Sequence, residues 1–180
     1  MPSLELRSDS ALDTSAEVLV MGVAKSPTGP RLFAPTEDFA ALEASLTAIG
    51  VSGANDELRR LPALRPGTPS LALVGLGTLP EGAEEPTADA LRNAAGSAIR
   101  QLAGTGSVAF ALPGAASEQI GAVLEGAAIA SYNFTGYRFS TLENAKQPVA
   151  AITVLVESLP DDAEALTARA RAVAGGVDRE

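Results

Sequence analysis

The stretch SLALVGLGTLPEGAEEPTADALRNAAGSAIRQLAGTGSVAFALPG, residues 70–114, contains the pattern of a strand, a loop, a helix and a second strand. Ser70–Gly77 is a short apolar run, and the acidic, proline-containing loop after it has a composition that disfavours regular structure. Thr87 opens a segment with apolar residues at helical spacing, which predicts an N-capped helix. Ser107–Gly114 is apolar again and ends in Pro-Gly. This order of elements predicts an α/β domain.

The alternation continues on both sides of this stretch. Further strands are expected at Leu4–Arg7, Glu17–Lys25 and Pro148–Glu157. Further helices are expected from Thr36, as N-cap, to Gly50 and from Ser117 to about Tyr132. A last helix is expected to begin at Asp161 and Asp162 and to continue to the end of the chain. Its apolar positions are Leu166, Ala170, Val173 and Val177. We therefore expect a single domain over residues 1–180. Its three layers would be a central mixed, largely parallel sheet flanked by helices.

The composition excludes several kinds of chemistry. A chain of 180 residues can bury a core without covalent staples, since a domain of this size buries roughly 70% of the surface that its unfolded chain exposes. There is no cysteine, which excludes disulfides and thiolate zinc sites. There is also no histidine, so both the commonest metal ligand and the commonest acid–base catalyst are missing.

The charge balance argues against nucleic acid and membrane partners. The formal net charge is −9, so the field of the whole molecule repels phosphates and anionic lipid surfaces. Arg59, Arg60 and Arg65 are interpreted as solvated charges in a loop. No apolar run approaches the roughly 20 residues that span a bilayer, and the first ten residues lack the pattern of a signal peptide. We expect a soluble, unexported, cytoplasmic protein.

No residue is nominated as catalytic, cofactor-binding or metal-ligating. Gly75–Gly77 follows a strand but does not match a dinucleotide-binding motif, so we interpret it as a plain strand-to-loop turn. The carboxylate pairs Glu84–Glu85 and Asp161–Asp162 are interpreted as solvated, the second complementing a helix dipole. The serines lack any recognisable activating partner.

Four of the seven aromatic residues lie within residues 132–139. We expect the chain to reverse there at Asn133 and Gly136. Phe134 and Phe139 would then cover the end of the core, while Tyr132 and Tyr137 keep their hydroxyls hydrated or bonded to backbone. Contact with a partner is the alternative explanation, because Tyr and Phe are favoured in contact surfaces.

The segment GAAIASYNFTGYRFST, followed by a polar link and an apolar strand, resembles the end of the N-terminal domain in the leucyl aminopeptidase (cytosol aminopeptidase) family. The matching residues are Tyr132, Phe134, Tyr137 and Arg138. The strand LALVGLG and the closing helix LTARARAVAGGVDRE are also similar to the family pattern.

The resemblance implies a macro-domain-like fold and a non-catalytic N-terminal domain of a metal-dependent enzyme that removes N-terminal amino acids from peptides. The expected role of this domain is in assembly or regulation. Residues 161–180 would form a terminal helix leading toward an absent catalytic domain, and two divalent metal ions, zinc or manganese, are expected there rather than in this chain. The implied partners are that C-terminal domain and neighbouring subunits of a homo-hexamer. The chain alone is expected to be inactive.

Two alternatives remain. One is a stand-alone macro-like module that binds a nucleotide or ADP-ribose through the loops after LALVGLG and VAFALPG, an inference from fold analogy alone. The other is DNA binding, as in some bacterial relatives, which the acidic composition disfavours.

Overall fold

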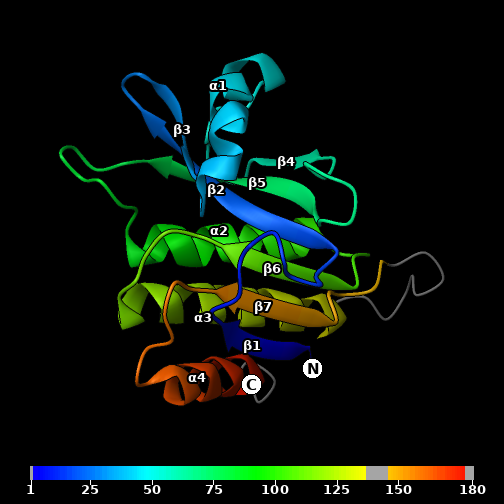
Figure 1. Ribbon diagram of the computed structural model, residues 1–180. Coiled ribbons are helices and arrows are strands. Elements are labelled where there is room, and N and C mark those ends of the chain that lie inside the picture. Colours follow the sequence, from blue (N-terminus) through cyan, green and yellow to red (C-terminus); the bar gives the residue numbers. More distant parts are fainter. Residues whose placement is uncertain (1, 137–145, 177–180) are drawn as a thin grey trace.

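The computed structural model describes residues 2–136 and 146–176, and the side chains of residues 133–136 are not among those described. A seven-stranded sheet runs through the molecule, with the strand order β1-β7-β6-β2-β5-β4 and with β3 paired to β2 (Figure 1). Five of the strands are parallel to one another: β1 (Ser3–Arg7), β7 (Ala151–Leu155), β6 (Ser107–Ala111), β2 (Val18–Ser26) and β5 (Ser70–Thr78). The expected largely parallel sheet is confirmed.

Two short antiparallel strands were not anticipated from the sequence. Strand β3 (Gly29–Phe33) pairs with the second half of β2, beyond the point where the pairing of β2 with β6 stops. Strand β4 (Leu58–Leu61) pairs with β5 at one edge of the sheet. Arg59 and Arg60 therefore lie in a strand, and their assignment to a loop was wrong. Arg65 lies outside regular structure.

Three helices cover one face of the sheet, and they begin at the same end of the molecule (Figure 1). They are α2 (Ala88–Gln101), α3 (Ser117–Gly136) and α4 (Ala163–Gly176). Apolar side chains of α2 and α3 pack on the strands, because both helices carry them at helical spacing. The large buried side chains of this layer include Leu91, Ile99, Leu102, Phe110, Leu124 and Ile152.

The opposite face is covered by the short 3₁₀ turn η1 (Glu37–Phe39) and by helix α1 (Ala40–Ile49). Phe39 and Leu46 are fully buried against strand residues such as Met21 and Leu73. The fold thus has helices on both sides of a mixed sheet, as the sequence predicts. Figure 1 shows α1 at the opposite end of the molecule from α4.

The helix boundaries confirm some capping predictions and correct others. Thr87 accepts a hydrogen bond from the backbone N–H of Ala90 (3.2 Å), and Gly50 closes α1 with a φ of 82°. Thr36 does not cap: it precedes η1 with no side-chain cap bond, and its hydroxyl donates to Asp38 instead (3.0 Å). Asp161 and Asp162 precede α4 rather than forming its first turn.

Helix α3 is longer than the sequence suggested. It runs to Gly136, so Asn133 lies within the helix and does not reverse the chain, and Gly136 is the last residue of the helix. Asn is only a moderately poor helix former, so the helix passes through position 133. The expected covering of the core by Phe134 and Phe139, and the expected environment of the Tyr137 hydroxyl, concern side chains outside the described ones.

The apolar stripe expected for α4 also needs correction. Ala170 and Ala174 are the buried positions and Leu166 is partly buried, whereas Val173 is 39% exposed. The burial follows the four-residue step from Leu166 through Ala170 to Ala174, and this step places Val173 off the packed face. Val177 lies outside the described residues.

Candidate functional site

The carboxyl edge of the sheet, where the parallel strands end, is the usual place for a ligand in an open α/β fold. Here the protein's own segment 53–57 lies against the ends of β2 and β5. The N–H groups of Gly75 and Gly77 donate to the carbonyls of Glu57 and Gly53, each at 2.9 Å. A Cβ atom at Gly75 would overlap the carbonyl oxygen of Ala54. The space beside these strand ends is therefore filled by backbone.

This packing corrects the interpretation of Gly75–Gly77 as a turn. All three residues belong to β5, and the pairing with β2 skips Leu76, so that Val23 faces Gly75 and Ala24 faces Gly77. The chain forms a β-bulge there, and the φ of Gly77 is +77°. Glycine is needed at positions 75 and 77 because segment 53–57 approaches the strand closely, and the residues do not form a phosphate-binding turn.

The loops after β5 and β6, proposed as a nucleotide site in the module alternative, are tied to each other. The side-chain amide of Gln119 donates to Glu85 (3.1 Å), and its oxygen accepts from the N–H of Ala116 (3.3 Å). The hydroxyl of Ser117 donates to Asp162 (2.8 Å), which connects the start of α3 to the start of α4. One member of each carboxylate pair, Glu85 and Asp162, is thus bound to the first turn of α3, in keeping with a structural interpretation.

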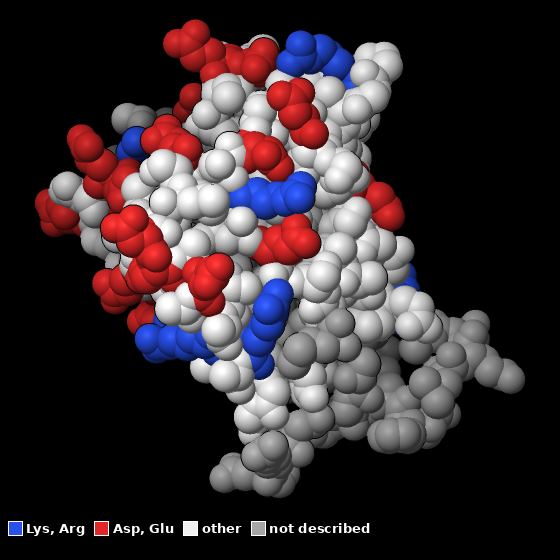
Figure 2. Space-filling model, turned by 60° about the horizontal axis from the view of Figure 1, so that its bottom comes forward, with Lys and Arg blue, Asp and Glu red and all other residues white. Residues whose placement is uncertain are grey.

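Acidic side chains gather at this end of the molecule, on the left of Figure 2, where α2, α3 and α4 begin. They come from the β5–α2 loop and from the residues at and before the helix starts: Glu81, Glu84, Glu85, Asp89, Glu118, Asp161, Asp162 and Glu164. Carboxylates are favoured at helix N-termini, and they repel a phosphate. The electrostatics of this end therefore disfavour a nucleotide.

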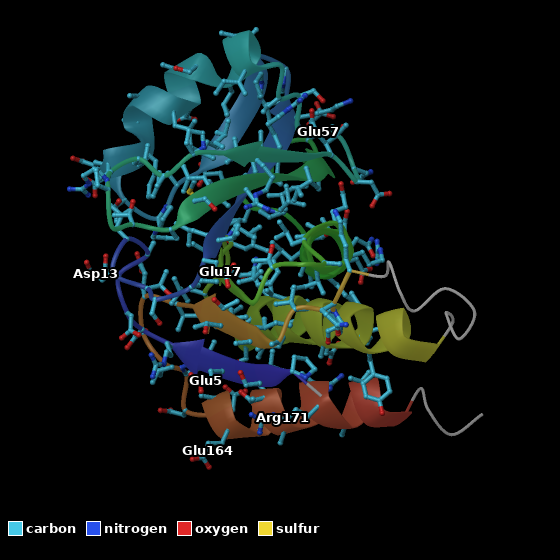
Figure 3. The ribbon with its side chains drawn as sticks, turned by 90° about the vertical axis from the view of Figure 1, so that its right-hand side faces the viewer. Glu5, Asp13, Glu17, Glu57, Glu164 and Arg171 are labelled. Carbon is cyan, nitrogen blue, oxygen red and sulfur yellow. The ribbon has the colours of Figure 1, made fainter. Side chains whose placement is uncertain are left out.

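Glu57 sits in a ring of backbone donors near β4 (Figure 3). Its carboxylate accepts from the N–H groups of Ser52 (3.1 Å), Gly53 (2.7 Å) and Ala54 (3.2 Å), and from the hydroxyl of Ser52 (3.2 Å). Partial burial acts to raise the pKa of this carboxyl. The hydrogen bonds outweigh the burial and hold the pKa below its ordinary value. The backbone N–H groups of residues 52–54 thus bind the carboxylate of Glu57.

A second cluster of charges, the Glu125 cluster, joins the three helices on the α2–α4 face. Glu125 of α3 is only 9% exposed. It pairs with Arg92 of α2 (3.2 Å) and with Arg169 of α4 (3.0 Å), and Arg92 also pairs with Asp89. A largely buried carboxylate is costly when no partner remains, and Glu125 has one on each neighbouring helix, so this cluster serves helix packing.

An open groove of about 490 Å³ lies beside this cluster, between α2, α3 and the segment at 55–56. The cationic residues of this groove are Arg92 and Arg100. Arg92 pairs with Glu125, and Arg100 pairs with Asp56 at 3.8 Å. Both arginines already face carboxylates, which weakens the attraction of this groove for an anion.

Sequence inspection missed the Glu125 cluster and the Glu57 loop. One signal for the first was present: Glu125 is the single charged residue in the run GAVLEGAAIA, residues 121–130, on a helix predicted to be apolar. The Glu57 loop left no local signal, because its donors are backbone groups.

No group of three Asp, Glu, His or Cys side chains in residues 2–136 and 146–176 is placed to hold a metal ion. Within the same residues, no helix has the length and apolar character needed to cross a membrane. Arg138 and the aromatic side chains after Tyr132, which carried the family resemblance, lie outside the described side chains.

Comparison with known families places residues 21–141 in the "Cytosol aminopeptidase family, N-terminal domain". The probable cytosol aminopeptidase of Leifsonia xyli is 46% identical over 175 residues, which cover 96% of this chain and 33% of that protein. The probable cytosol aminopeptidase of Clavibacter michiganensis is 39% identical over 180 residues, covering 98% of this chain and 35% of the relative. The chain thus spans about a third of the length of these relatives.

Among solved structures, a tomato leucine aminopeptidase mutant matches with a TM-score of 0.69 at 18% identity, over 98% of this chain and 37% of that one. The bottromycin maturation enzyme BotP matches with a TM-score of 0.58 at 22% identity, over 89% of this chain and 31% of its own. At these identities the two structures support the fold.

Proposed function

Because the chain belongs to the cytosol aminopeptidase family and corresponds to its N-terminal domain, we propose that it is a non-catalytic domain that helps assemble or regulate a metal-dependent leucyl aminopeptidase. The observation that carries this proposal is the extent of the alignment with the relatives. The chain aligns along almost its whole extent with only a third of its relatives, which leaves most of those proteins for another part.

The side chains present support a non-catalytic role. The sequence has no histidine and no cysteine, and several of the described carboxylates, such as Glu57, Glu125 and Asp162, are held by hydrogen bonds or ion pairs. The two divalent ions, zinc or manganese, that we expect in the full-length enzyme do not fit any cluster in the described part of this chain. We assign them to a catalytic domain that follows this one.

The full-length protein would remove N-terminal amino acids from peptides in the cytoplasm. Its partners would be its own C-terminal domain and neighbouring subunits of a homo-hexamer, with residues 161–180 leading toward the catalytic part. What this domain offers such an assembly is a body in which α2 and α3 are joined by the Arg92–Glu125 pair, and the β5–α2 loop is joined to α3 by Gln119.

The first experiment assays the 180-residue chain alone for release of leucine from a chromogenic leucyl substrate with added Mn²⁺ or Zn²⁺. We expect no turnover. Metal-dependent turnover by a clean preparation would reject the non-catalytic assignment.

The second experiment addresses the role in assembly. The reading frame beyond residue 180 is sequenced, and the full-length protein is compared with a version lacking residues 1–180 by light scattering and by peptide hydrolysis. We expect the truncation to change the subunit number or the kinetics. An unchanged mass and unchanged kinetics would reject the role, and an immediate stop codon would favour an independent module.

A further inference from the structure

We propose that α4 is a releasable helix, which detaches from the folded domain as one unit and uncovers the parts of α3 and β1 against which it packs. The proposal concerns the 180-residue chain by itself and does not depend on the proposed function. It rests on how α4 is held.

The apolar contact of α4 is small. Only Ala170 and Ala174 are buried, and Leu166 packs partly against the core. Helix α2, of the same length, buries seven residues, among them Leu91 and Ile99. Since hydrophobic stabilisation follows the apolar area removed from water, α4 gains much less than α2. An isolated helix of 14 residues is marginal in water, so α4 depends on its docking.

Three polar anchors supply much of that docking. Arg169 pairs with Glu125 of α3 at 3.0 Å, and Arg171 donates to the carbonyl oxygen of Leu4 at 2.7 Å. Asp162, just before the helix, accepts from Ser117 at 2.8 Å. Figure 3 shows Arg171 between α4 and β1. The Arg169 side chain is 73% exposed, so salt weakens its ion pair.

Release of α4 leaves few unpaired groups behind. When Arg169 leaves, Glu125 keeps the two bonds that Arg92 donates to its Oε2, at 3.2 and 3.4 Å, and water can reach the Oε1 that Arg169 had bound. The carbonyl of Leu4 lies on β1, an edge strand of the sheet, where water can replace the guanidinium. The cost of opening is therefore low compared with that of α2 or α3.

The absence of cysteine in the wild-type chain allows a direct test. Ala170→Cys places one thiol beneath α4, and Ala95→Cys places one beneath α2; both alanines are 0% exposed. We expect the thiol at 170 to react with a small thiol reagent at least about tenfold faster, as sub-global opening requires. Raising the salt from about 0.05 to about 1 M should speed the reaction at 170 only. Ala174→Cys is the second site if the first variant does not fold.

A second measurement removes an anchor. We expect Arg171→Gln to speed hydrogen exchange in α4 by about tenfold, with α2 and α3 unchanged, because a charge-assisted bond is lost. The matched control is Arg100→Gln, which removes an exposed arginine from α2 and should leave α4 unchanged. Equal labelling at 170 and 95, or equal acceleration of all three helices by Arg171→Gln, would overturn the proposal.

Discussion

Gly75 lies where segment 53–57 meets the end of β5, and the two backbones touch there. A methyl group at this position would overlap the carbonyl oxygen of Ala54. Backbone cannot rotate away as a side chain can, so either the segment or the bulge must shift. We expect Gly75→Ala to lower the free energy of unfolding by about 3 kcal/mol, as overpacking against rigid atoms does. Urea unfolding measures the loss.

Gly176→Ala is the matched control for this substitution. A Cβ atom at Gly176 would meet no atom within 4 Å, at a backbone conformation that other residues adopt readily. The change should alter the free energy of unfolding by less than about 0.5 kcal/mol. If Gly75→Ala proves as stable as this control, the close approach of segment 53–57 is wrong.

Glu57 makes the stability of the domain depend on pH. The hydrogen bonds from residues 52–54 hold its pKa below the ordinary value, so the folded state favours the charged form. That stabilisation is fully present above the pKa of the unfolded chain, and it is lost as the pH falls through the lowered folded pKa. We expect Glu57→Gln to cost about 1 kcal/mol at neutral pH and almost nothing in acid below that pKa.

Urea unfolding at a series of pH values checks this expectation. Glu81→Gln changes an exposed carboxylate in the β5–α2 loop and serves as control, with an effect below about 0.5 kcal/mol at neutral pH. A difference between wild type and Glu57→Gln that grows on acidification would contradict the direction of the pKa shift.

At the scale of elements, the sequence predicted those helices and strands that interactions between neighbouring residues determine. The strand–loop–helix–strand order of residues 70–114 was correct, including the cap at Thr87, because apolar periodicity and capping act within a few residues. Strands β3 and β4 were missed for the opposite reason. Their sequences, GPRLF and LRRL, contain a proline or two arginines, and they become strands by pairing with β2 and β5.

The difference between local and long-range contacts also limits what the sequence predicts about the site. The interpretation of Gly75–Gly77 as a turn was wrong. Positions 75 and 77 need glycine because they contact segment 53–57, which lies some twenty residues earlier in the chain. The Glu125 cluster likewise joins residues on three helices. Contacts between distant elements carry no local pattern, so the sequence could indicate the absence of histidine and cysteine but not where the carboxylates meet.

At the scale of the whole molecule, the charge of −9 is unevenly placed. Acidic side chains collect where α2, α3 and α4 begin, at the carboxyl edge of the sheet, on the left of Figure 2. A dinucleotide that entered at this edge would bring its phosphates toward carboxylates and would meet the backbone of segment 53–57. Repulsion and lack of space therefore act in the same direction.

We therefore expect no saturable heat when ADP-ribose is titrated into the 180-residue chain in a calorimeter, even at low ionic strength. A repeat at about 0.5 M salt is the control, because weak non-specific attraction through exposed arginines would disappear there. Glu84→Gln with Glu85→Gln tests the cause: removing two of the charges should still not create a site, since segment 53–57 continues to fill the strand ends. Saturable binding that survives high salt would restore the stand-alone binding module and place its ligand outside this edge.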